Sequence, residues 1–315
     1  MVLHKYKQLP LRSLVDTLLA GPSCGNLDMG WGRLFGGQLC AQSLSAALVK
    51  APSGALAHSI HCTFLREGSV DETPRYEVEV LREGRSFSTI KVRGLQRHGI
   101  VCETIVSTHV GEEGLDHQVC MPDELDPVRD LGPNIARYTK FKESSDGGTI
   151  PPVLKDIYMD ECQPIIMRPI SFASDCIETH TKTEESVESR HWIKLNGSLD
   201  SSGMELSKEQ VSQICLAFLT DFRFLSTSLL PHGVTLWQGT IQPASLSHSL
   251  YFHRPFVLDD WVLFNKKTPN ASMARGFVNG EIFERNSGKL LASAVQEGLI
   301  RPRTLKRNTA KSFFS

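Results

Sequence analysis

The stretch GRLFGGQLCAQSLSAALVKAP, residues 32–52, decides the fold of this chain. It opens at Gly36-Gly37, is rich in Ala, Ser and Leu, and stops at Lys50 before Pro52, which is the pattern of a helix. Small side chains occur on most sides of this helix. We therefore expect other backbone to wrap closely around it, as around a central helix rather than a surface one.

Strand patterns follow the helix. The segment HSIHCTFL (58–65) is a strand candidate, and residues 75–110 contain the clearest alternation in the chain, with apolar side chains between glutamates at 76–80. Turn signals at 83–84 and 98–99 divide residues 75–110 into three strands. The first half therefore predicts one helix followed by an antiparallel meander.

The second half repeats this order. LSKEQVSQICLAFLTDF (206–222) places Ser207 and Gln210 at capping-box spacing, so a helix should begin near Lys208 and run for three to four turns. Strand candidates continue to residue 301, with a turn signal at 286–288. A helix followed by a long meander thus occurs twice, at a period of about 190 residues.

The segment between the halves, residues 121–152, is rich in proline and charge and predicts a linker. We therefore predict an α+β protein with a double hotdog architecture, in which two antiparallel sheets each wrap around a long central helix and pair edge to edge. Periodicity by itself leaves other α+β folds open. The predicted parts are an N-terminal hotdog (1–118), a linker (119–158), a C-terminal hotdog (159–303) and a tail (304–315).

Composition narrows the functional classes. Thirty-four basic and thirty-five acidic residues give a net charge of −1, which offers no footprint for nucleic acid or an anionic membrane. No apolar run approaches the roughly 20 residues of a membrane span, and the N-terminus lacks a secretory h-region. Eight cysteines without a C-x-x-C pair indicate reduced thiols. Near the N-terminus an amphipathic helix is expected to place five apolar residues on one side: Leu11, Leu14, Val15, Leu18 and Leu19.

Six motifs carry a family resemblance. They are FGGQ (35–38), LREGRSFS (81–88), LTDFRFL (219–225), HSLYFHRPF (248–256), ARGFVNGEIF (274–283) and VQEGLIR (295–301). In this order the chain resembles, over roughly residues 10–303, the type II acyl-CoA thioesterases, which include bacterial thioesterase II and the peroxisomal thioesterases of eukaryotes. The resemblance implies a double hotdog that hydrolyses fatty acyl-CoA to free acid and CoA.

The resemblance also implies catalytic residues in the second hotdog. Asp221 in LTDFRFL would be the acid, Ser245 in PASLSHS the hydroxyl, where bacterial members often have Thr, and Gln296 in VQEG the amide. Ser247 departs from the Asp that relatives usually carry there. Taken singly, these residues are more typical of an incidental acid near a helix end, an edge-strand hydroxyl and an exposed strand amide.

The chemistry of the three residues suits thioester hydrolysis. Asp221 could act as general base for an attacking water, Ser245 could hold that water, and Gln296 could orient the water or the carboxylate. Partial burial of Asp221 would favour this role by raising its pKa. Backbone N–H groups or the Gln296 amide would bind the oxyanion, and no covalent intermediate is required.

Further residues are candidates for substrate binding. Gly36 and Gly37 could simply be a loop that ends at a helix start, or they could allow close backbone approach to the thioester or to the facing subunit. Arg254 and Arg275, together with Arg85, lie in or beside family motifs and could meet the phosphates of CoA, although surface ion pairs explain them equally well. Three phenylalanines could line an acyl channel or belong to the core: Phe218, Phe222 and Phe224.

The histidines give no catalytic or metal pattern. His58 lacks a nearby acid and nucleophile and is better interpreted as a satisfied strand residue; His248 and His253 are treated alike. No H-x-x-x-H zinc spacing occurs, so we expect neither a metal nor a cofactor.

Two other functions stay open from the sequence: a hotdog hydratase or dehydratase of acyl thioesters, and a non-catalytic acyl-CoA-binding protein. Family resemblance implies a homodimer or homotetramer. It also implies the peroxisome, although AKSFFS at 310–315 is not an S-K-L address, so the cytosol and mitochondrion remain alternatives; secretion is not expected.

Overall fold

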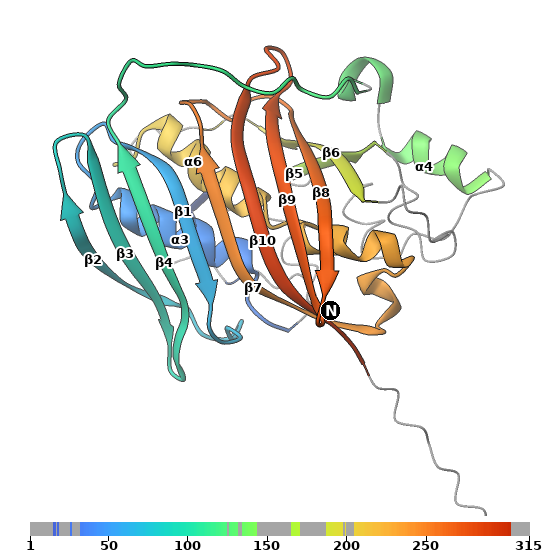
Figure 1. Ribbon diagram of the computed structural model, residues 1–315, viewed down its shortest axis with the longest axis horizontal. Helices are drawn as coiled ribbons and strands as arrows, with labels where there is room; N and C mark the ends of the chain where they lie inside the picture. Colours follow the sequence, from blue (N-terminus) through green and yellow to red (C-terminus); the bar gives the residue numbers. More distant parts are fainter. Residues whose placement is uncertain are drawn as a thin grey trace, which may run out of the picture.

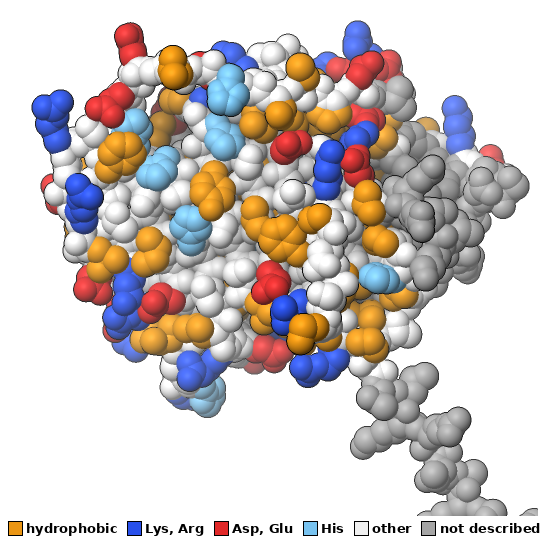
Figure 2. All heavy atoms as spheres, in the orientation of Figure 1, with side chains coloured by type: hydrophobic (Ala, Val, Ile, Leu, Met, Phe, Trp, Pro, Cys, Tyr) orange, Lys and Arg blue, Asp and Glu red, His pale blue; other side chains and the backbone are white. Residues whose placement is uncertain are grey.

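The computed structural model describes residues 15, 16, 18, 26, 32–124, 126–131, 134–143, 165–170, 187–197, 199 and 205–303. In these residues a ten-stranded antiparallel sheet curves around two helices, α3 and α6, which lie against the same face of the sheet (Figure 1). The face of the molecule in Figure 2 carries apolar, charged and histidine side chains intermingled, in keeping with the balanced net charge.

The first half follows the predicted helix and meander. Helix α3 is capped by extended Phe35 and buried along nearly its whole length, because its small side chains allow the sheet to approach. The predicted turns at 83–84 and 98–99 separate consecutive strands. The elements are α3 (Gly36–Leu48), β1 (Leu56–Phe64), β2 (Arg75–Glu83), β3 (Phe87–Gln96) and β4 (Gly99–His109), and the strand order is β2-β3-β4-β1.

The second half repeats the arrangement, with strand order β7-β10-β9-β8-β6-β5. The predicted capping box is present: Gln210 N donates to Ser207 Oγ at 3.2 Å, and Ser207 N donates to Gln210 Oε1 at 2.8 Å. The elements are β5 (Ile165–Pro169), β6 (Glu188–Leu195), α6 (Lys208–Leu219), the 3₁₀ segments η3 (Leu225–His232) and η4 (Leu236–Gln238), β7 (Ile241–Phe252), β8 (Val262–Ser272), β9 (Arg275–Glu284) and β10 (Leu290–Pro302).

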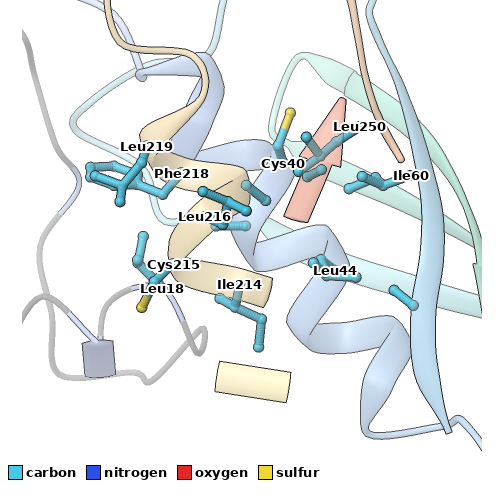
Figure 3. Packing of buried hydrophobic residues seen from close by; sticks show 14 of the residues in the cluster. Leu18, Cys40, Leu44, Ile60, Ile214, Cys215, Leu216, Phe218, Leu219 and Leu250 are labelled. Carbon is cyan, nitrogen blue, oxygen red and sulfur yellow. The ribbon is translucent and has the colours of Figure 1, made fainter. Parts of the chain in front are cut away.

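The two halves share one sheet and one core. Strand β1 pairs antiparallel with β7, from Ser59 opposite Tyr251 to Thr63 opposite Ser247, so the predicted edge-to-edge pairing joins the sheets. Helices α3 and α6 pack together beneath this junction. Figure 3 shows Leu44 and Cys40 of α3 beside Ile214 and Phe218 of α6 in one buried cluster. The five described cysteines are free thiols.

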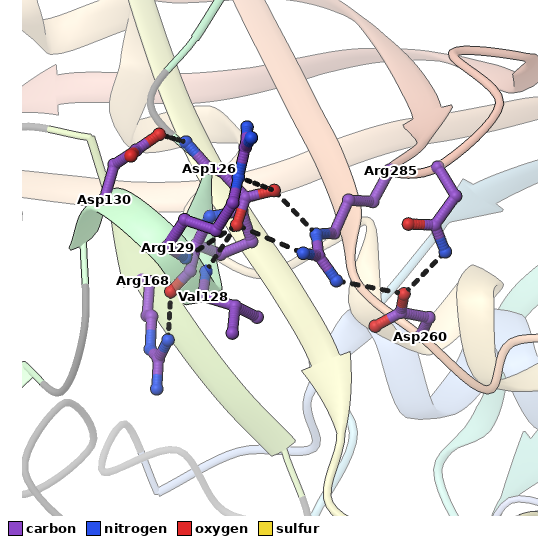
Figure 4. A network of polar contacts seen from close by, with 9 residues as sticks. Asp126, Val128, Arg129, Asp130, Arg168, Asp260 and Arg285 are labelled. Atoms are coloured by element: carbon purple, nitrogen blue, oxygen red, sulfur yellow. Dashed lines mark hydrogen bonds and ion pairs between the residues drawn. The ribbon is translucent and has the colours of Figure 1, made fainter.

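The chain between the halves crosses the end of the sheet as an extended segment that leads to η1 (Pro127–Leu131) and α4 (Asn134–Glu143) (Figure 1). Asp126 attaches it to the second half through Arg285, which also contacts Asp260 (Figure 4). The predicted linker thus contains helical turns where it is described.

Two predicted segments, the N-terminal helix and the C-terminal tail, lie partly or wholly outside the described residues. Val15 and Leu18 of the expected N-terminal helix are buried in the main core, whereas Leu11, Leu14 and Leu19 lie outside the described residues, as does the tail from 304. Within the described part of the chain, no helix has the length and apolar character needed to cross a bilayer.

Candidate active site

Asp221 lies in the turn that follows α6. The helix ends at Leu219 with Thr220 as its C-cap, and Phe222 N donates to Leu219 O at 3.1 Å. The backbone then turns at Arg223, whose φ of 54° is in the left-handed region. Lys266 Nζ donates to the Arg223 carbonyl at 3.3 Å. This turn places the Asp221 carboxylate inside the molecule, where the residue is only 9% exposed.

The structure brings Asp221, Ser245 and Gln296 into one hydrogen-bond network. Gln296 Nε2 donates to Asp221 Oδ1 at 2.8 Å and to Ser245 Oγ at 2.7 Å. Gln296 is fully buried on β10, and Ser245 is on β7, an internal strand. Ser245 is therefore not on an edge strand and Gln296 is not exposed, while Asp221 lies near a helix end as a partnered, buried acid.

The first half of the chain supplies the other partner of the carboxylate. Gly37 N, in the first turn of α3, donates to Asp221 Oδ2 at 2.8 Å. A Cβ at Gly37 would lie 2.6 Å from Phe218 O, and one at Gly36 would lie 2.8 Å from Asp221 Oδ2. Glycine is required here because α3 begins directly against the Asp221 turn. The positive end of the α3 dipole also favours a negative charge at this position.

A β-bulge sets the direction of Ser245. Strands β7 and β10 pair with Gln296 opposite His248 and with Gly298 opposite Ser245, and the register shifts between Glu297 and Gly298. Ser245 and His248 are three positions apart in the chain, so in a regular strand their side chains would lie on opposite faces. The extra residue of the bulge allows both to lie on the face that carries Gln296.

A cavity of about 350 Å³ opens beside the network and is lined by Asp221, Ser245 and Gly36. Most of its other walls are apolar, and they include Phe222 and Phe224. Phe218 is fully buried in the core, with its ring 5.3 Å from that of Phe35. Two of the three predicted acyl-channel phenylalanines therefore line the cavity.

Three arginines that the sequence reasoning did not select line this cavity: Arg33, Arg66 and Arg223. Arg33 donates to Pro243 O at 2.6 Å and pairs with Glu67 at 2.9 Å, and Arg66 donates to Ile100 O at 2.9 Å. Burial lowers the pKa of Arg223 to about 9. Arg33 and Arg223 lie beside or within FGGQ and LTDFRFL, so proximity to a motif was the available signal.

The arginines predicted to bind substrate are placed elsewhere. Arg254 contacts Leu290 O at 3.1 Å and Asp116 at 3.3 Å, and Arg275 Nε donates to Glu297 Oε1 at 2.8 Å. Neither residue lines the cavity, and Arg85 does not line it either. Substrate binding by Arg254 and Arg275 stays a prediction without a contact that supports it.

The histidines divide into two groups. His58 is outside the cavity wall, and its ring is 5.5 Å from that of Phe87; burial and then the neighbouring His109 lower its pKa. His248, which the sequence reasoning treated as a strand residue, is 1% exposed and lies directly opposite Gln296. Among the described residues, no three His, Cys, Asp or Glu side chains gather as a metal site would need.

The network has capacity to hold a further group. Each carboxylate oxygen of Asp221 accepts one hydrogen bond from the protein and retains a lone pair. Ser245 Oγ accepts from Gln296, so its own hydrogen is available to donate toward the cavity. A water in the cavity could therefore donate to Asp221 and accept from Ser245, which is the arrangement that a general base requires.

Two family models match parts of this chain. Residues 26–110 match the family model of the acyl-CoA thioesterase N-terminal domain, and residues 169–299 match that of acyl-CoA thioesterase. Acyl-CoA thioesterase 2 of Haemophilus influenzae is 33% identical over 294 residues, which cover 93% of this chain and 95% of that protein.

Two solved structures show the fold. The acyl-CoA thioesterase II TesB2 of Mycobacterium marinum superposes with a TM-score of 0.68 at 23% identity, over 92% of this chain and 99% of that one. A hot dog fold protein of unknown function from Alicyclobacillus acidocaldarius gives a TM-score of 0.66 at 15% identity, with the same coverage. With the joined sheet and paired helices, these likenesses show that the chain is a double hotdog.

Proposed function

The chain belongs to the acyl-CoA thioesterase family, and from this premise we propose that it hydrolyses fatty acyl-CoA thioesters with Asp221, Ser245 and Gln296 as its catalytic residues. One observation carries the proposal of the site. The buried Asp221 carboxylate is held by Gln296 and by the backbone of Gly37, and it opens onto a mostly apolar cavity.

The reaction follows from the contacts. A water held by Asp221 and Ser245 attacks the thioester carbonyl carbon and transfers its proton to Asp221 as the tetrahedral oxyanion forms. The oxyanion then collapses, the C–S bond breaks, and the sulfur leaves as the thiolate of CoA, which takes up the proton held by Asp221 and so restores the carboxylate. Gln296 keeps the carboxylate and the hydroxyl in fixed positions, which maintains the attack geometry.

Backbone amides are the better candidates for the oxyanion donor. Gln296 Nε2 already donates twice within the protein. Gly36 lies in the cavity wall at the N-terminus of α3; Gly37 N already donates to Asp221 and Gln38 N to Phe35 O, whereas Gly36 N has no backbone acceptor among the described residues. We assign the oxyanion to this end of α3, where the helix dipole also favours negative charge.

The cavity supports a fatty acyl-CoA as substrate. Its apolar walls suit an acyl chain, and Arg33 and Arg66 in the same walls could pair with the phosphates of CoA. A hydratase would need a histidine facing the substrate beside Asp221, and no histidine is among the described residues that line the cavity. Hydrolysis is therefore the function that the geometry supports best.

Release of CoA thiol tests the proposal. We expect the pure protein to release thiol from palmitoyl-CoA and from shorter acyl-CoAs, and Asp221→Asn to lower kcat by roughly 10²–10⁴-fold because the general base is lost. Glu297→Gln is the matched control: it neutralises the next residue on β10, which pairs with Arg275 outside the cavity wall. If Asp221→Asn kept the activity of the parent, Asp221 could not be the general base. Binding of acyl-CoA without turnover would identify a non-catalytic binder.

We further propose a homodimer or homotetramer, as the family resemblance implies, and residence in the peroxisome, which is supported by a yeast relative named as a peroxisomal acyl-coenzyme A thioester hydrolase. Light scattering of the pure chain measures the oligomeric state. Imaging of a tagged chain beside a peroxisomal marker measures its location. A monomer, or a cytosolic or mitochondrial signal, would contradict the respective proposal.

A further inference from the structure

His248 is a buried histidine that the proposed reaction leaves unused. It lies on β7, and its Nε2 is 3.0 Å from Oγ1 of Thr220, the residue directly before Asp221. Its ring packs edge-on against Phe224 at 5.8 Å. His248 does not line the cavity, so it cannot touch a substrate there. Its position between Thr220 and Gln296 nevertheless connects it to the residues on either side of the carboxylate.

Two buried polar atoms without partners occur on the residues that pair at this position. Among the described residues, Oε1 of Gln296 and Nδ1 of His248 are both buried, and neither has a hydrogen-bond partner. The two residues are directly opposite each other on β10 and β7. One buried acceptor and one buried ring nitrogen on adjacent strands satisfy each other if Nδ1 carries the hydrogen, and leaving both unpaired would cost several kcal/mol.

The protonation state of the ring fits this contact. Burial lowers the pKa of His248, while the charge of Asp221 and the amide of Gln296 act in the opposite direction. Because burial is the largest cause, His248 is neutral at physiological pH and carries one hydrogen. The other ring nitrogen is then an acceptor. The single hydroxyl hydrogen of Thr220 has two acceptors in reach, Ala217 O at 3.2 Å and His248 Nε2 at 3.0 Å, and it is shared toward the shorter contact when Nδ1 carries the ring hydrogen.

The orientation of Gln296 needs such a partner. Both hydrogens of its amide nitrogen are directed to acceptors, Asp221 Oδ1 and Ser245 Oγ. If the amide turned over, its oxygen would face the carboxylate, and two acceptors would repel each other. A donor at the opposite edge of the amide selects the productive orientation.

We propose that His248 is a positioning residue of the hydrolytic site: its Nδ1–H donates to Oε1 of Gln296, its Nε2 accepts from Thr220, and together these contacts fix the Gln296 amide toward Asp221 and Ser245. This inference rests on the proposed function, because it assigns His248 a role through the same network. His248 itself transfers no proton in the reaction.

A matched pair of substitutions separates the two ring nitrogens. In His248→Asn the side-chain nitrogen lies near the position of Nδ1 and can still donate to Gln296. In His248→Gln the nitrogen lies near the position of Nε2 and reaches Thr220 instead. We expect kcat on palmitoyl-CoA to stay within about threefold of the parent for Asn and to fall roughly 10–100-fold for Gln, with KM unchanged in both, since the substrate does not contact this residue.

Coupling to Gln296 gives a second readout. Because His248 acts through Gln296, His248→Gln should lower kcat no further once Gln296→Leu is present. A merely structural role predicts instead that the two variants of His248 lose kcat alike, in step with their unfolding temperatures, and that the losses add in the double variant. Either result would overturn the proposal.

A measurement without turnover distinguishes this inference from the proposed function. With ¹⁵N-labelled histidine in the full chain, and the His248 signals identified by their loss in His248→Asn, we expect NMR to show the hydrogen on Nδ1. A hydrogen on Nε2 would refute the inference even in an active enzyme. Failure of the parent to release CoA from any acyl-CoA would instead refute the proposed function.

Discussion

At the residue scale, the site depends on one carboxylate shared between segments that are far apart in the chain. Asp221 follows α6, and the groups that hold it come from α3 and β10. A carboxylate buried without partners would cost several kcal/mol. Here the hydrogen bonds from Gly37 and Gln296 compensate that cost, and the cavity beside Asp221 leaves room for a water.

Gly37 offers a prediction at this scale. Gly37→Ala would place a Cβ 2.6 Å from Phe218 O and 2.5 Å from Phe35 Cε1, so the start of α3 must shift away from Asp221. We expect a loss of roughly 1–3 kcal/mol in the free energy of unfolding, measured with urea, and a lower kcat. Gly111→Ala is the control, since a Cβ there meets nothing within 4 Å. Equal stability of the two variants would contradict the close approach.

At the scale of elements, local sequence signals located most helices and strands. The capping box at Ser207 and the turn residues at 83–84, 98–99 and 286–288 were sufficient because each acts within a few residues of itself. The turn between β8 and β9 gave no signal. Met273 and Ala274 form it with φ values of 51° and 58°, which Asn and Gly adopt more readily.

The backbone of this turn is strained, and substitution of its two residues should relieve the strain. Both residues occupy the left-handed region; Met273 is 83% exposed, and Ala274, which is half-buried, would lose only a methyl group. Replacing Met273-Ala274 with Asn-Gly should raise the free energy of unfolding by about 1 kcal/mol. Chemical denaturation measures the change. Met273→Ser, which removes the apolar side chain without relieving the backbone, should show little of the gain.

The segment between the halves is attached to the second half by the ion pair of Asp126 with Arg285, and the stabilisation from this pair depends on pH. Hydrogen bonds from Arg285 are the main cause that lowers the pKa of Asp126 to about 2, from its usual 3.8; the backbone N–H groups of Arg129 and Val128 add to the effect. Because the folded pKa is depressed, the stabilisation is fully present above about pH 4 and is lost as the pH falls toward 2.

Asp126→Asn tests this attachment. We expect it to lower the unfolding temperature at pH 7, and we expect the difference from the parent to shrink as the pH falls from about 4 toward 2. Thermal unfolding across this range measures both. Asp123→Asn, at an exposed carboxylate three residues earlier, is the control. A difference that stays constant with pH would show that the carboxylate charge contributes nothing.

At the scale of the whole molecule, the two hotdogs form one structural unit. The sheet is continuous through β1 and β7, and the main hydrophobic cluster contains residues of both halves, such as Leu44 and Ile214. The hydrogen bond from Gly37 to Asp221 also crosses the junction. Neither half can therefore complete its core or the site without the other.

We expect the two halves to unfold together as one cooperative unit. We expect β3 and β4 of the first half and β9 and β10 of the second half to exchange their amide hydrogens through a common opening reaction of equal free energy. Hydrogen exchange with mass spectrometry, at increasing denaturant below the unfolding midpoint, measures each segment separately. Separate opening free energies that differ by several kcal/mol would contradict a single cooperative unit.

The sequence by itself determined most of the elements and their order, the capping box, the doubled helix and meander, and the motifs that led to Asp221, Ser245 and Gln296. Those properties depend on neighbours along the chain or on recurring patterns. Only the tertiary structure decided that Gly37 binds the carboxylate, that a bulge turns Ser245 inward, that Arg33 and Arg66 rather than Arg254 and Arg275 line the cavity, and that His248 faces Gln296. Each of these depends on distances between segments tens to hundreds of residues apart, which packing and strand register set.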